Sequence, residues 1–255
     1  MQMKTISEIN KEFENEEMSK WGNLFAFYAN DERSGVKNII TKYQRVLDKK
    51  QEEIARTEKM KRYEYQYEQI GYVCGIDEVG RGPLAGPVVA GAVILPKNCQ
   101  ILYLNDSKQV SAKKREELHD IIMAEAVAVG LGVVSPKRID EINILQATYE
   151  AMREAIGQLK ICPDILLNDA VTIPQVDIKQ VPIIKGDAKS VSIAAASIVA
   201  KVTRDRMMEQ YDAMFPEYGF ASNKGYGASV HVEALKEFGA TPIHRRSFIK
   251  NIVTV

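Results

Sequence analysis

The chain lacks several features that define whole classes of protein. Its 255 residues contain only 3 cysteines, 3 histidines and 1 tryptophan, and its 34 basic and 34 acidic side chains give a formal net charge of zero. The cysteines are odd in number, far apart and never spaced as Cys-X-X-Cys, which argues against a disulfide framework or a zinc site. No apolar run approaches the ~20 residues of a membrane span, and no signal peptide is recognisable at the start. We therefore expect a soluble, cytoplasmic protein with reduced cysteines.

The absence of net charge does not exclude a nucleic-acid substrate, because binding depends on where the basic residues cluster. The chain from Lys185 onward has a small surplus of Lys and Arg over Asp and Glu, whereas residues 1–70 hold equal numbers of the two. The surplus indicates a basic face in the last part of the chain. Electrostatics does not favour nucleic acid as a partner of residues 1–70.

Residues 1–70 are rich in charge and are predicted to be helical. Thr5-Ile6-Ser7-Glu8 fits a capping box at the start of a first helix. A second helical pattern begins near Ser34 and contains no proline and little glycine. Its apolar side chains recur at helical spacing: Val36, Ile39, Ile40, Tyr43, Val46 and Leu47. We predict two or more helices, with a break between about Trp21 and Ser34.

The stretch from Val73 to Pro96 carries the strongest pattern in the chain. A buried strand over 72–76 leads to two adjacent acids, Asp77 and Glu78, and a turn over 80–83 leads to a second apolar strand over 87–95. A carboxylate beside an apolar interior needs a metal, hydrogen bonds or water. Taken alone, the acid pair also fits a solvated turn. The Gly-Arg-Gly sequence beside it favours a ligand, because glycines let backbone amides and a guanidinium approach one closely.

Strands and helices alternate through the rest of the chain. The predicted elements are a helix from Ser111 to a glycine stop at Gly130, a strand over 131–134, a helix from Ser135 and Pro136, strands over 164–169 and 181–184, and helices over 190–215 and 229–238. This order predicts an α/β fold, a mixed β-sheet flanked by helices, with a helical N-terminal extension and C-terminal helices. We expect the extension to cover residues 1–70 and the main domain residues 71–255.

Three separate places in the pattern deliver four acids at strand exits: Asp77 and Glu78, Asp169, and Asp187. Gathered at one end of a sheet, they would repel each other and resist ionisation until a cation neutralised them. Oxygen ligands without a nearby thiolate or imidazole favour Mg²⁺ or Mn²⁺. Two such ions ~3.5–4 Å apart can promote phosphodiester hydrolysis. Adjacent strand residues point to opposite faces, so Asp77 and Glu78 can share these ions only at the end or edge of the strand.

The run GIDEVGRGPLAGPVVAGAV resembles the opening signature of bacterial ribonuclease HII, the type 2 ribonuclease H. The resemblance covers roughly residues 71 to 250 and continues in NDSK at 105–108, LND at 167–169, KGDAKS at 185–190, AASIVAK at 195–201, KGYG at 224–227 and PIHR at 242–245. It implies a ribonuclease-H-like sheet and a metal-dependent endonuclease. Such an enzyme hydrolyses the RNA strand of RNA/DNA hybrids and cuts 5′ to ribonucleotides in duplex DNA, leaving a 3′-hydroxyl and a 5′-phosphate. The implied roles are removal of ribonucleotides from DNA and removal of RNA primers.

The resemblance also implies residue roles. The four metal-binding acids of the family match Asp77, Glu78, Asp169 and Asp187 without a departure, for two Mg²⁺ or Mn²⁺ ions. Gly80, Arg81 and Gly82 match the contacts to the ribose 2′-hydroxyl, the group by which a protein distinguishes RNA from DNA. Tyr226 would pack on the deoxyribose that follows. Lys108 would contact a phosphate, and Ser190 would either hold a phosphate or cap a helix.

Other readings of the same residues make different predictions. The related type 3 enzymes have glutamate where Asp187 stands, lack Gly-Arg-Gly and carry a sheet-bearing N-terminal domain, so the sequence favours type 2. A junction resolvase or transposase-like nuclease would be a symmetric dimer without a reader of the 2′-hydroxyl. A non-catalytic hybrid-binding module would be favoured by the loss of one acid, and none is missing.

The role of residues 1–70 stays open at the sequence level. Lys59, Lys61, Arg62 and neighbouring tyrosines could touch the nucleic-acid substrate, or the helices could dock a protein partner, although a solvated helix face explains the charges as well. Nothing in the sequence requires more than a monomer. No membrane partner is expected.

Overall fold

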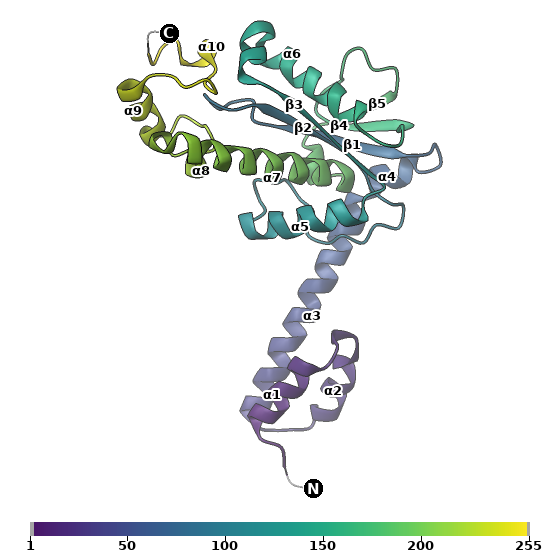
Figure 1. Cartoon of the computed structure of the whole chain (residues 1–255). Helices are drawn as coiled ribbons and strands as arrows, with labels where there is room; N and C mark the ends of the chain where they lie inside the picture. Colours follow the sequence, from purple (N-terminus) through teal and green to yellow (C-terminus); the bar gives the residue numbers. More distant parts are fainter. Residues whose placement is uncertain (1–2, 254–255) are drawn as a thin grey trace. The chain divides into compact units, whose positions relative to one another are not determined.

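The computed structural model describes residues 3–253, which fall into two compact units that divide between Glu58 and Lys59. Figure 1 labels the helices and strands of both units. Within residues 3–253, no helix combines the length and the apolar character that a bilayer crossing requires.

The first unit is helical, as predicted. It contains α1 (Ile6–Asn15), the 3₁₀ turn η1 (Met18–Lys20), α2 (Trp21–Tyr28) and most of α3 (Ser34–Met60). The capping box is confirmed: the Thr5 hydroxyl accepts from the Glu8 amide, and the Glu8 carboxylate accepts from the Thr5 amide at 2.7 Å. Phe13 lies at the centre of the core and stacks on Tyr43 at 4.7 Å between ring centroids.

The predicted break between Trp21 and Ser34 is wrong over most of its length, because residues 21–28 form α2. The Trp21 ring is buried, and its indole N–H donates to the carbonyl oxygens of Phe13 at 3.0 Å and Glu16 at 3.1 Å. These long-range contacts stabilise a segment whose own sequence has no clear helical start. The real break is the short connection over residues 29–33.

The second unit contains a five-stranded mixed sheet, which confirms the predicted fold class. The strands are β1 (Val73–Val79), β2 (Val88–Ile94), β3 (Ala128–Val134), β4 (Ile165–Asp169) and β5 (Lys179–Ile183), in the spatial order β3-β2-β1-β4-β5. β2 pairs antiparallel with β1 and with β3, whereas β1, β4 and β5 are parallel to each other. The carboxyl ends of three strands therefore meet at one edge of the sheet.

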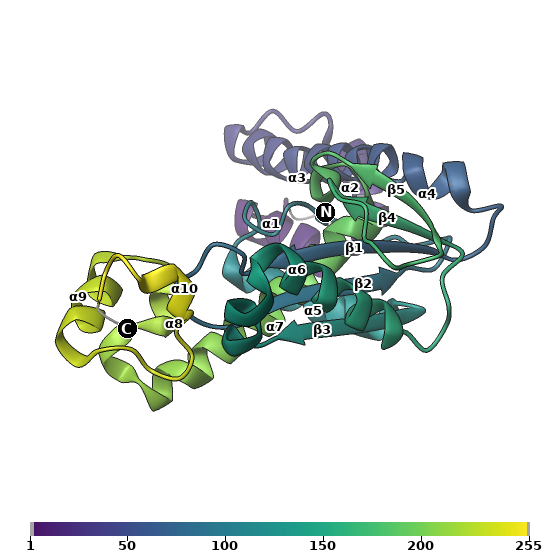
Figure 2. The same cartoon turned by 90° about the horizontal axis from the view of Figure 1, so that it is seen from above.

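Helices cover both faces of this sheet (Figure 1). α6 (Pro136–Gly157) packs on one face, and α7 (Val191–Met214) packs on the other, with α5 (Ala112–Glu125) beside α7. All seven residues of β2 are buried, as expected for a strand with two covered faces. The remaining helical segments are α4 (Arg62–Tyr67), η2 (Gly186–Ala188), η3 (Pro216–Tyr218), α8 (Phe220–Asn223), α9 (Ser229–Phe238) and α10 (Arg246–Ile249). Figure 2 shows α8, α9 and α10 grouped at one end of this unit.

One predicted helix end is wrong. The helix after Ser111 ends at Glu125, and Gly130 lies inside β3, which begins at Ala128 instead of residue 131. This position requires glycine because α6 packs very close to the strand. A Cβ atom at residue 130 would overlap the carbonyl oxygen of Ala155. Gly132 faces the carbonyl oxygen of Ala151 in the same way. These glycines serve helix packing and do not terminate a helix.

Replacing Gly132 with alanine is expected to lower the free energy of unfolding by about 3 kcal/mol, because α6 or β3 must move to admit the methyl group. Gly157 is a matched control in α6, since a Cβ atom there would meet nothing within 4 Å. Gly157→Ala should be neutral or stabilise by about 0.5–1 kcal/mol. Urea unfolding of the two variants measures the difference, and equal midpoints would contradict the packing argument.

Candidate active site

The four predicted acids lie at the carboxyl edge of the parallel strands. Asp77 and Glu78 are near the end of β1, Asp169 is the last residue of β4, and Asp187 lies in η2 after β5. The register pairs Ile76 with Asn168, so the next residues along, Asp77 and Asp169, come from adjacent strands at the same level. The alternation of strands and helices thus brings together acids that are more than a hundred positions apart in the chain.

Asp77 is the most deeply buried of the four, with 6% of its surface exposed. Burial, followed by the charges of Glu78 and Asp169, raises the pKa of Asp77 well above its usual value. Its Oδ1 accepts from the Glu78 amide at 2.7 Å, and a hydrogen bond with Ser197 favours the ionised form. The site therefore holds a carboxylate where ionisation is costly in the absence of a cation.

β1 continues through both acids to Val79, further than the sequence predicts. Burial raises the pKa of Glu78, and a hydrogen bond from Arg81 Nη1 to Glu78 Oε1 at 3.1 Å opposes the shift. Asp169 Oδ1 accepts from the Gly186 amide at 2.7 Å. Within residues 3–253, no three side chains of Asp, Glu, His or Cys converge closely enough to ligate one ion. The acids lie along one edge of the sheet, and three of them, Asp77, Glu78 and Asp169, accept hydrogen bonds from protein donors.

Asp187 is half-buried at this edge. Burial, followed by the charges of Asp106 and Asp169, raises the pKa of Asp187 to about 6. Two residues close to the acids in sequence adopt unusual backbone conformations. Ala170, directly after Asp169, has φ 57°, and Lys185, two residues before Asp187, has φ 56°. Non-glycine residues in this left-handed region are strained, and such strain is concentrated at functional sites.

The donor set fits a hard divalent cation. It consists of carboxylates, and burial and mutual repulsion raise the pKa values of Asp77, Glu78 and Asp187. A bound cation would offset both effects. Mg²⁺ and Mn²⁺ prefer such oxygen ligands. The resident groups of this edge are thus suited to metal binding.

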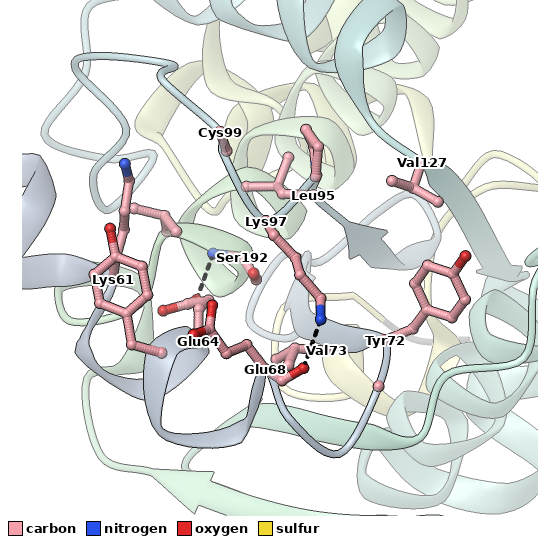
Figure 3. Close-up of a pocket in the computed structure, with 14 residues that line it drawn as sticks. Lys61, Glu64, Glu68, Tyr72, Val73, Leu95, Lys97, Cys99, Val127 and Ser192 are labelled. Carbon is pink, nitrogen blue, oxygen red and sulfur yellow. Dashed lines mark hydrogen bonds between the residues drawn. The ribbon is translucent and has the colours of Figure 1, made fainter.

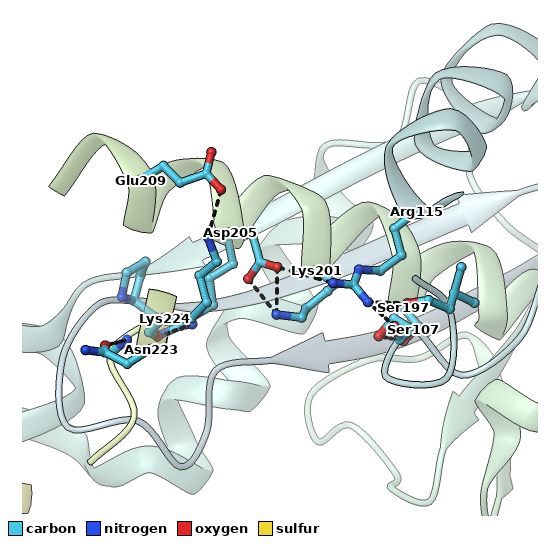
Figure 4. A network of polar contacts seen from close by, with 12 residues as sticks. Ser107, Arg115, Ser197, Lys201, Asp205, Glu209, Asn223 and Lys224 are labelled. Atoms are coloured by element: carbon cyan, nitrogen blue, oxygen red, sulfur yellow. Dashed lines mark hydrogen bonds and ion pairs between the residues drawn. The ribbon is translucent and has the colours of Figure 1, made fainter. Parts of the chain in front are cut away.

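A polar network links the loop over residues 105–108 to α7 (Figure 4). The hydroxyls of Ser107 and Ser197 are hydrogen-bonded at 2.9 Å, and Ser197 also contacts the Asp77 carboxylate. Arg115 donates to the carbonyl oxygen of Ser107 at 2.8 Å. The loop places Asp106 and the exposed Lys108 near Asp187, since both influence the pKa of Asp187.

The Gly-Arg-Gly turn and Tyr226 lie together on the surface. The nearest atom to a Cβ added at Gly82 is Cε1 of Tyr226, at 3.7 Å. The Arg81 side chain is 45% exposed and Tyr226 is 46% exposed. The amides of Leu84 and Ala85 both donate to the carbonyl oxygen of Gly225, which ties this turn to the segment that carries Tyr226. Three of the predicted substrate-reading residues, Arg81, Gly82 and Tyr226, are thus exposed side by side, whereas Gly80 is buried beneath them.

Ser190 occupies a different environment from the other predicted substrate contacts. It is fully buried at the N-cap of α7, where its hydroxyl accepts from the Ile193 amide and donates to Glu64 Oε1 at 2.5 Å. Glu64 Oε1 also accepts from the Ser192 amide at 3.0 Å. The structure therefore shows a helix cap, and the phosphate contact stays a prediction.

Glu64 also lines a small cavity of about 70 Å³ (Figure 3). The cavity lies beside Val73, at the start of β1, whereas the four acids lie at the opposite end of that strand. Burial raises the pKa of Glu64. The cavity is therefore separate from the candidate active site.

Sequence reasoning missed Asp106, Ser197 and Glu64. Asp106 and Ser197 lie inside motifs that carry the family resemblance, and those motifs are the signal that could have singled them out. No spacing rule, however, predicts their contacts with acids from other strands. Glu64 belongs to a charged helix in which nothing distinguishes it from its neighbours.

Comparisons with known proteins give a consistent result. The family profile described as ribonuclease HII matches residues 74–251, and that of the ribonuclease HII N-terminal domain matches residues 5–68. Ribonuclease HII of Lachnoclostridium phytofermentans is 62% identical over 98% of each chain, and that of Clostridioides difficile is 51% identical over 99% of this chain and all of its own. The solved ribonuclease H2 of Pyrococcus horikoshii superposes with a TM-score of 0.59 at 30% identity, over 71% of this chain and 96% of its own.

Proposed function

Since the chain belongs to the ribonuclease HII family and is therefore a ribonuclease H, we propose that it cuts on the 5′ side of ribonucleotides in duplex DNA and hydrolyses the RNA strand of RNA/DNA hybrids. The products are a 3′-hydroxyl and a 5′-phosphate. The reaction serves the removal of ribonucleotides from DNA and of RNA primers. The observation that carries this proposal is the placement of four acids along one edge of the sheet, close to the exposed side chain of Arg81.

Asp77, Glu78, Asp169 and Asp187 are the residues that hold the catalytic cations in this proposal. Two bound Mg²⁺ or Mn²⁺ ions supply an activated water and charge stabilisation at the leaving oxygen. Asp77 is held in place by Ser197 and the Glu78 amide, and Asp169 by the Gly186 amide. Glu78 would hold a cation, and its contact with Arg81 at 3.1 Å places the guanidinium beside that ligand. The metal-binding acids and the substrate-reading turn thus meet at this one pair.

The reading of the substrate rests on a second group of residues. Gly80, Arg81 and Gly82 contact the ribose 2′-hydroxyl, and Tyr226 packs on the next deoxyribose, where an added hydroxyl would be crowded. Their proximity in the structure supports this division of roles. Lys108 contacts a phosphate from its exposed position beside Asp187. Ser190 contributes by fixing the start of α7, with a phosphate contact as its second assigned role.

Residues 1–70 form a separate helical domain in this proposal, and residues 71–255 form the catalytic domain. The separate N-terminal family profile over residues 5–68 supports the division, whereas the compact units divide earlier, between Glu58 and Lys59. The extension contacts either the nucleic-acid substrate or a protein partner, and the catalytic domain acts as a monomer. Deletion of the extension separates the two roles, because loss of substrate contact lowers affinity and reduces the salt dependence of binding.

The function is tested by cleavage of a DNA duplex that contains one ribonucleotide, with Mg²⁺, with Mn²⁺ and with chelator, beside an all-DNA duplex. We expect a metal-dependent cut immediately 5′ to the ribonucleotide and no cut in the control. Cutting only in a long RNA/DNA hybrid would indicate type 3-like specificity. No cutting of either substrate by folded protein would favour a binding module.

Arg81→Ala is expected to change substrate selectivity more than stability. The side chain is 45% exposed, so its loss should alter the free energy of unfolding by less than about 0.5 kcal/mol. Loss of a charge-assisted contact to the substrate should lower kcat/KM for the single-ribonucleotide duplex by about 10-fold or more. Parallel assays on that duplex and on a long hybrid measure the effect, and an unchanged preference would remove Arg81 from the reader.

A further inference from the structure

Two fully buried arginines lie behind the Gly-Arg-Gly turn. Arg204, on α7, and Arg245, just before α10, are both 0% exposed and are among the largest completely buried side chains. Arginine is almost never fully buried unless it is paired. Here the partners of the guanidinium groups are backbone carbonyls, five of them within residues 80–87 and one at Lys224.

Arg245 donates to backbone carbonyls at both ends of the segment 80–86. Its Nη2 donates to the carbonyl oxygen of Gly80 at 2.5 Å, its Nη1 to that of Arg81 at 2.9 Å, and its Nε to that of Gly86 at 3.0 Å. Two of the three acceptors therefore belong to the predicted reader of the 2′-hydroxyl. A planar guanidinium presents its donors in a fixed geometry. These three bonds therefore fix both the distance and the orientation of the turn relative to Arg245.

Arg204 binds the second half of the turn and a separate segment. Its Nη2 donates to the carbonyl oxygen of Ala85 at 3.1 Å and its Nε to that of Pro87 at 2.9 Å. Its Nη1 donates to the carbonyl oxygen of Lys224 at 2.9 Å, two residues before Tyr226. One side chain thus connects the Gly-Arg-Gly turn to the segment that carries the tyrosine.

The glycines of the turn are adapted to these arginines. Gly80 has φ 90° and Gly86 has φ 86°, and a Cβ atom at Gly80 would overlap Nε of Arg204. At Gly86 it would overlap the sulfur of Met208 and lie 3.1 Å from Nη2 of Arg204. Gly82 differs, because among the described residues beyond its chain neighbours a Cβ atom there would come within 4 Å of Tyr226 alone. Gly80 accordingly serves the arginine contact, whereas Gly82 faces the exposed surface.

Backbone hydrogen bonds complete the assembly. The Arg245 amide donates to the carbonyl oxygen of Leu84 at 2.9 Å, and the Gly86 amide donates to that of Ile243 at 2.8 Å. Together with the bonds from residues 84 and 85 to Gly225, they join three segments that are far apart in sequence: residues 80–87, 224–226 and 243–245. We call these segments the reader block.

The burial of two cations is costly. Burial, with the charge of Arg204 as a second cause, lowers the pKa of Arg245 to about 9, and burial lowers the pKa of Arg204 to about 10. Both groups remain charged at neutral pH. Such a cost is offset only when the donors are satisfied, and removal of one arginine leaves three carbonyl acceptors without partners. A hydrophobic core would stabilise this region without that cost.

We propose that Arg204 and Arg245 are positioning residues that fix the Gly-Arg-Gly turn relative to Tyr226, and that this spacing determines selectivity for the RNA-to-DNA junction. The inference rests on the proposed function of residues 80–82 and 226. Neither arginine touches the substrate, because both are enclosed within the reader block. They act by holding the two substrate-reading groups in a fixed position relative to each other.

The test compares kcat/KM for a duplex with a single ribonucleotide and for an RNA/DNA hybrid of the same sequence. Arg245→Met removes the donors while it keeps much of the volume, and Arg245→Lys and Arg204→Lys keep the charge without the fork. We expect the ratio of the two values to fall about 10-fold or more in Arg245→Met, with a smaller fall in the lysine variants, because misplacement of a reading group by ~1 Å can cost up to 10²-fold. Arg206→Met is the control: Arg206 lies on α7, is partly exposed and pairs with Glu116.

The outcomes separate the inference from the function on which it rests. A wild-type enzyme without junction preference would overturn the proposed function. A wild-type preference that persists in folded Arg245 and Arg204 variants, with both substrates affected equally, would overturn the positioning role.

Hydrogen exchange at the amides of Leu84, Gly86 and Arg245 gives a readout without substrate. Faster exchange in the variants than in Arg206→Met supports the reader block, and unchanged protection contradicts it. If Arg245→Met does not fold, the lysine variants decide the same comparison.

Discussion

Replacement of Asp77 by asparagine is expected to lower kcat about 10³-fold or more, while the protein stays folded. Asp77 is 6% exposed and stands between Glu78 and Asp169, so its carboxylate is the charge most directly required to hold a cation at the sheet edge. A catalytic metal contributes several kcal/mol of transition-state stabilisation, and each 1.36 kcal/mol corresponds to a factor of ten in rate. Steady-state cleavage of a single-ribonucleotide duplex measures the loss.

Asp77→Asn should lose activity without losing stability, and its free energy of unfolding should stay the same or increase. Burial and neighbouring negative charges make the ionised form of Asp77 unfavourable, and asparagine removes that charge at nearly the same size. Asp77→Asn should therefore unfold in metal-free urea at the same midpoint as the wild type or at a higher one. Asp177→Asn is the control, because Asp177 is an exposed acid between β4 and β5. Activity within tenfold of wild type in Asp77→Asn would contradict the metal assignment.

The second large effect concerns Mg²⁺, pH and stability. The pKa of Asp187 is raised to about 6 from its ordinary 3.8, first by burial and then by Asp106 and Asp169. The folded state therefore holds this proton more tightly than the unfolded state. The contribution of Asp187 to stability is greatest below about pH 4 and is lost as the pH rises to about 6. Asp187→Asn cannot ionise, so its metal-free stability relative to wild type should increase through this window and then level off.

Mg²⁺ should reverse that order at neutral pH. A ligand that binds only the folded state at 100 times its Kd adds about 2.7 kcal/mol. The wild type should gain stability by this amount, whereas Asp187→Asn should gain much less because one ligand is missing. Urea titrations from pH 4 to 8, with and without Mg²⁺, measure both parts. A difference between the two proteins that is flat across this pH range, or an equal gain with Mg²⁺, would refute the proposed role of Asp187.

The fold could be predicted because its signals are local. Apolar runs such as 73–76 and 165–167 mark strands by themselves, and Ser135-Pro136 marks a helix start whatever surrounds it. The placement of four acids at one edge follows from the same reasoning, because parallel strands bring their carboxyl ends together. Gly130 was misassigned because its reason, the close approach of α6, lies twenty-five residues away at Ala155.

The parts of the site that sequence reasoning missed depend on contacts between distant segments. Arg204 and Arg245 each stand in helical or loop patterns that fit exposed cations equally well, and only the fold shows them bound to carbonyls more than a hundred positions away. Ser197 is likewise an ordinary residue until α7 brings it to Asp77, and Ser107 until its loop brings it to Ser197. Physical constraints of this kind arise from tertiary packing, which no local pattern encodes.

The most direct test of the central claim, that Asp77, Glu78, Asp169 and Asp187 together form the metal centre, is anomalous X-ray scattering from crystals soaked in Mn²⁺. We predict manganese peaks in direct contact with these four carboxylates and their loss in Asp77→Asn crystals soaked in parallel. Peaks confined to other surface acids, or peaks at the sheet edge that persist unchanged in the variant, would contradict the account.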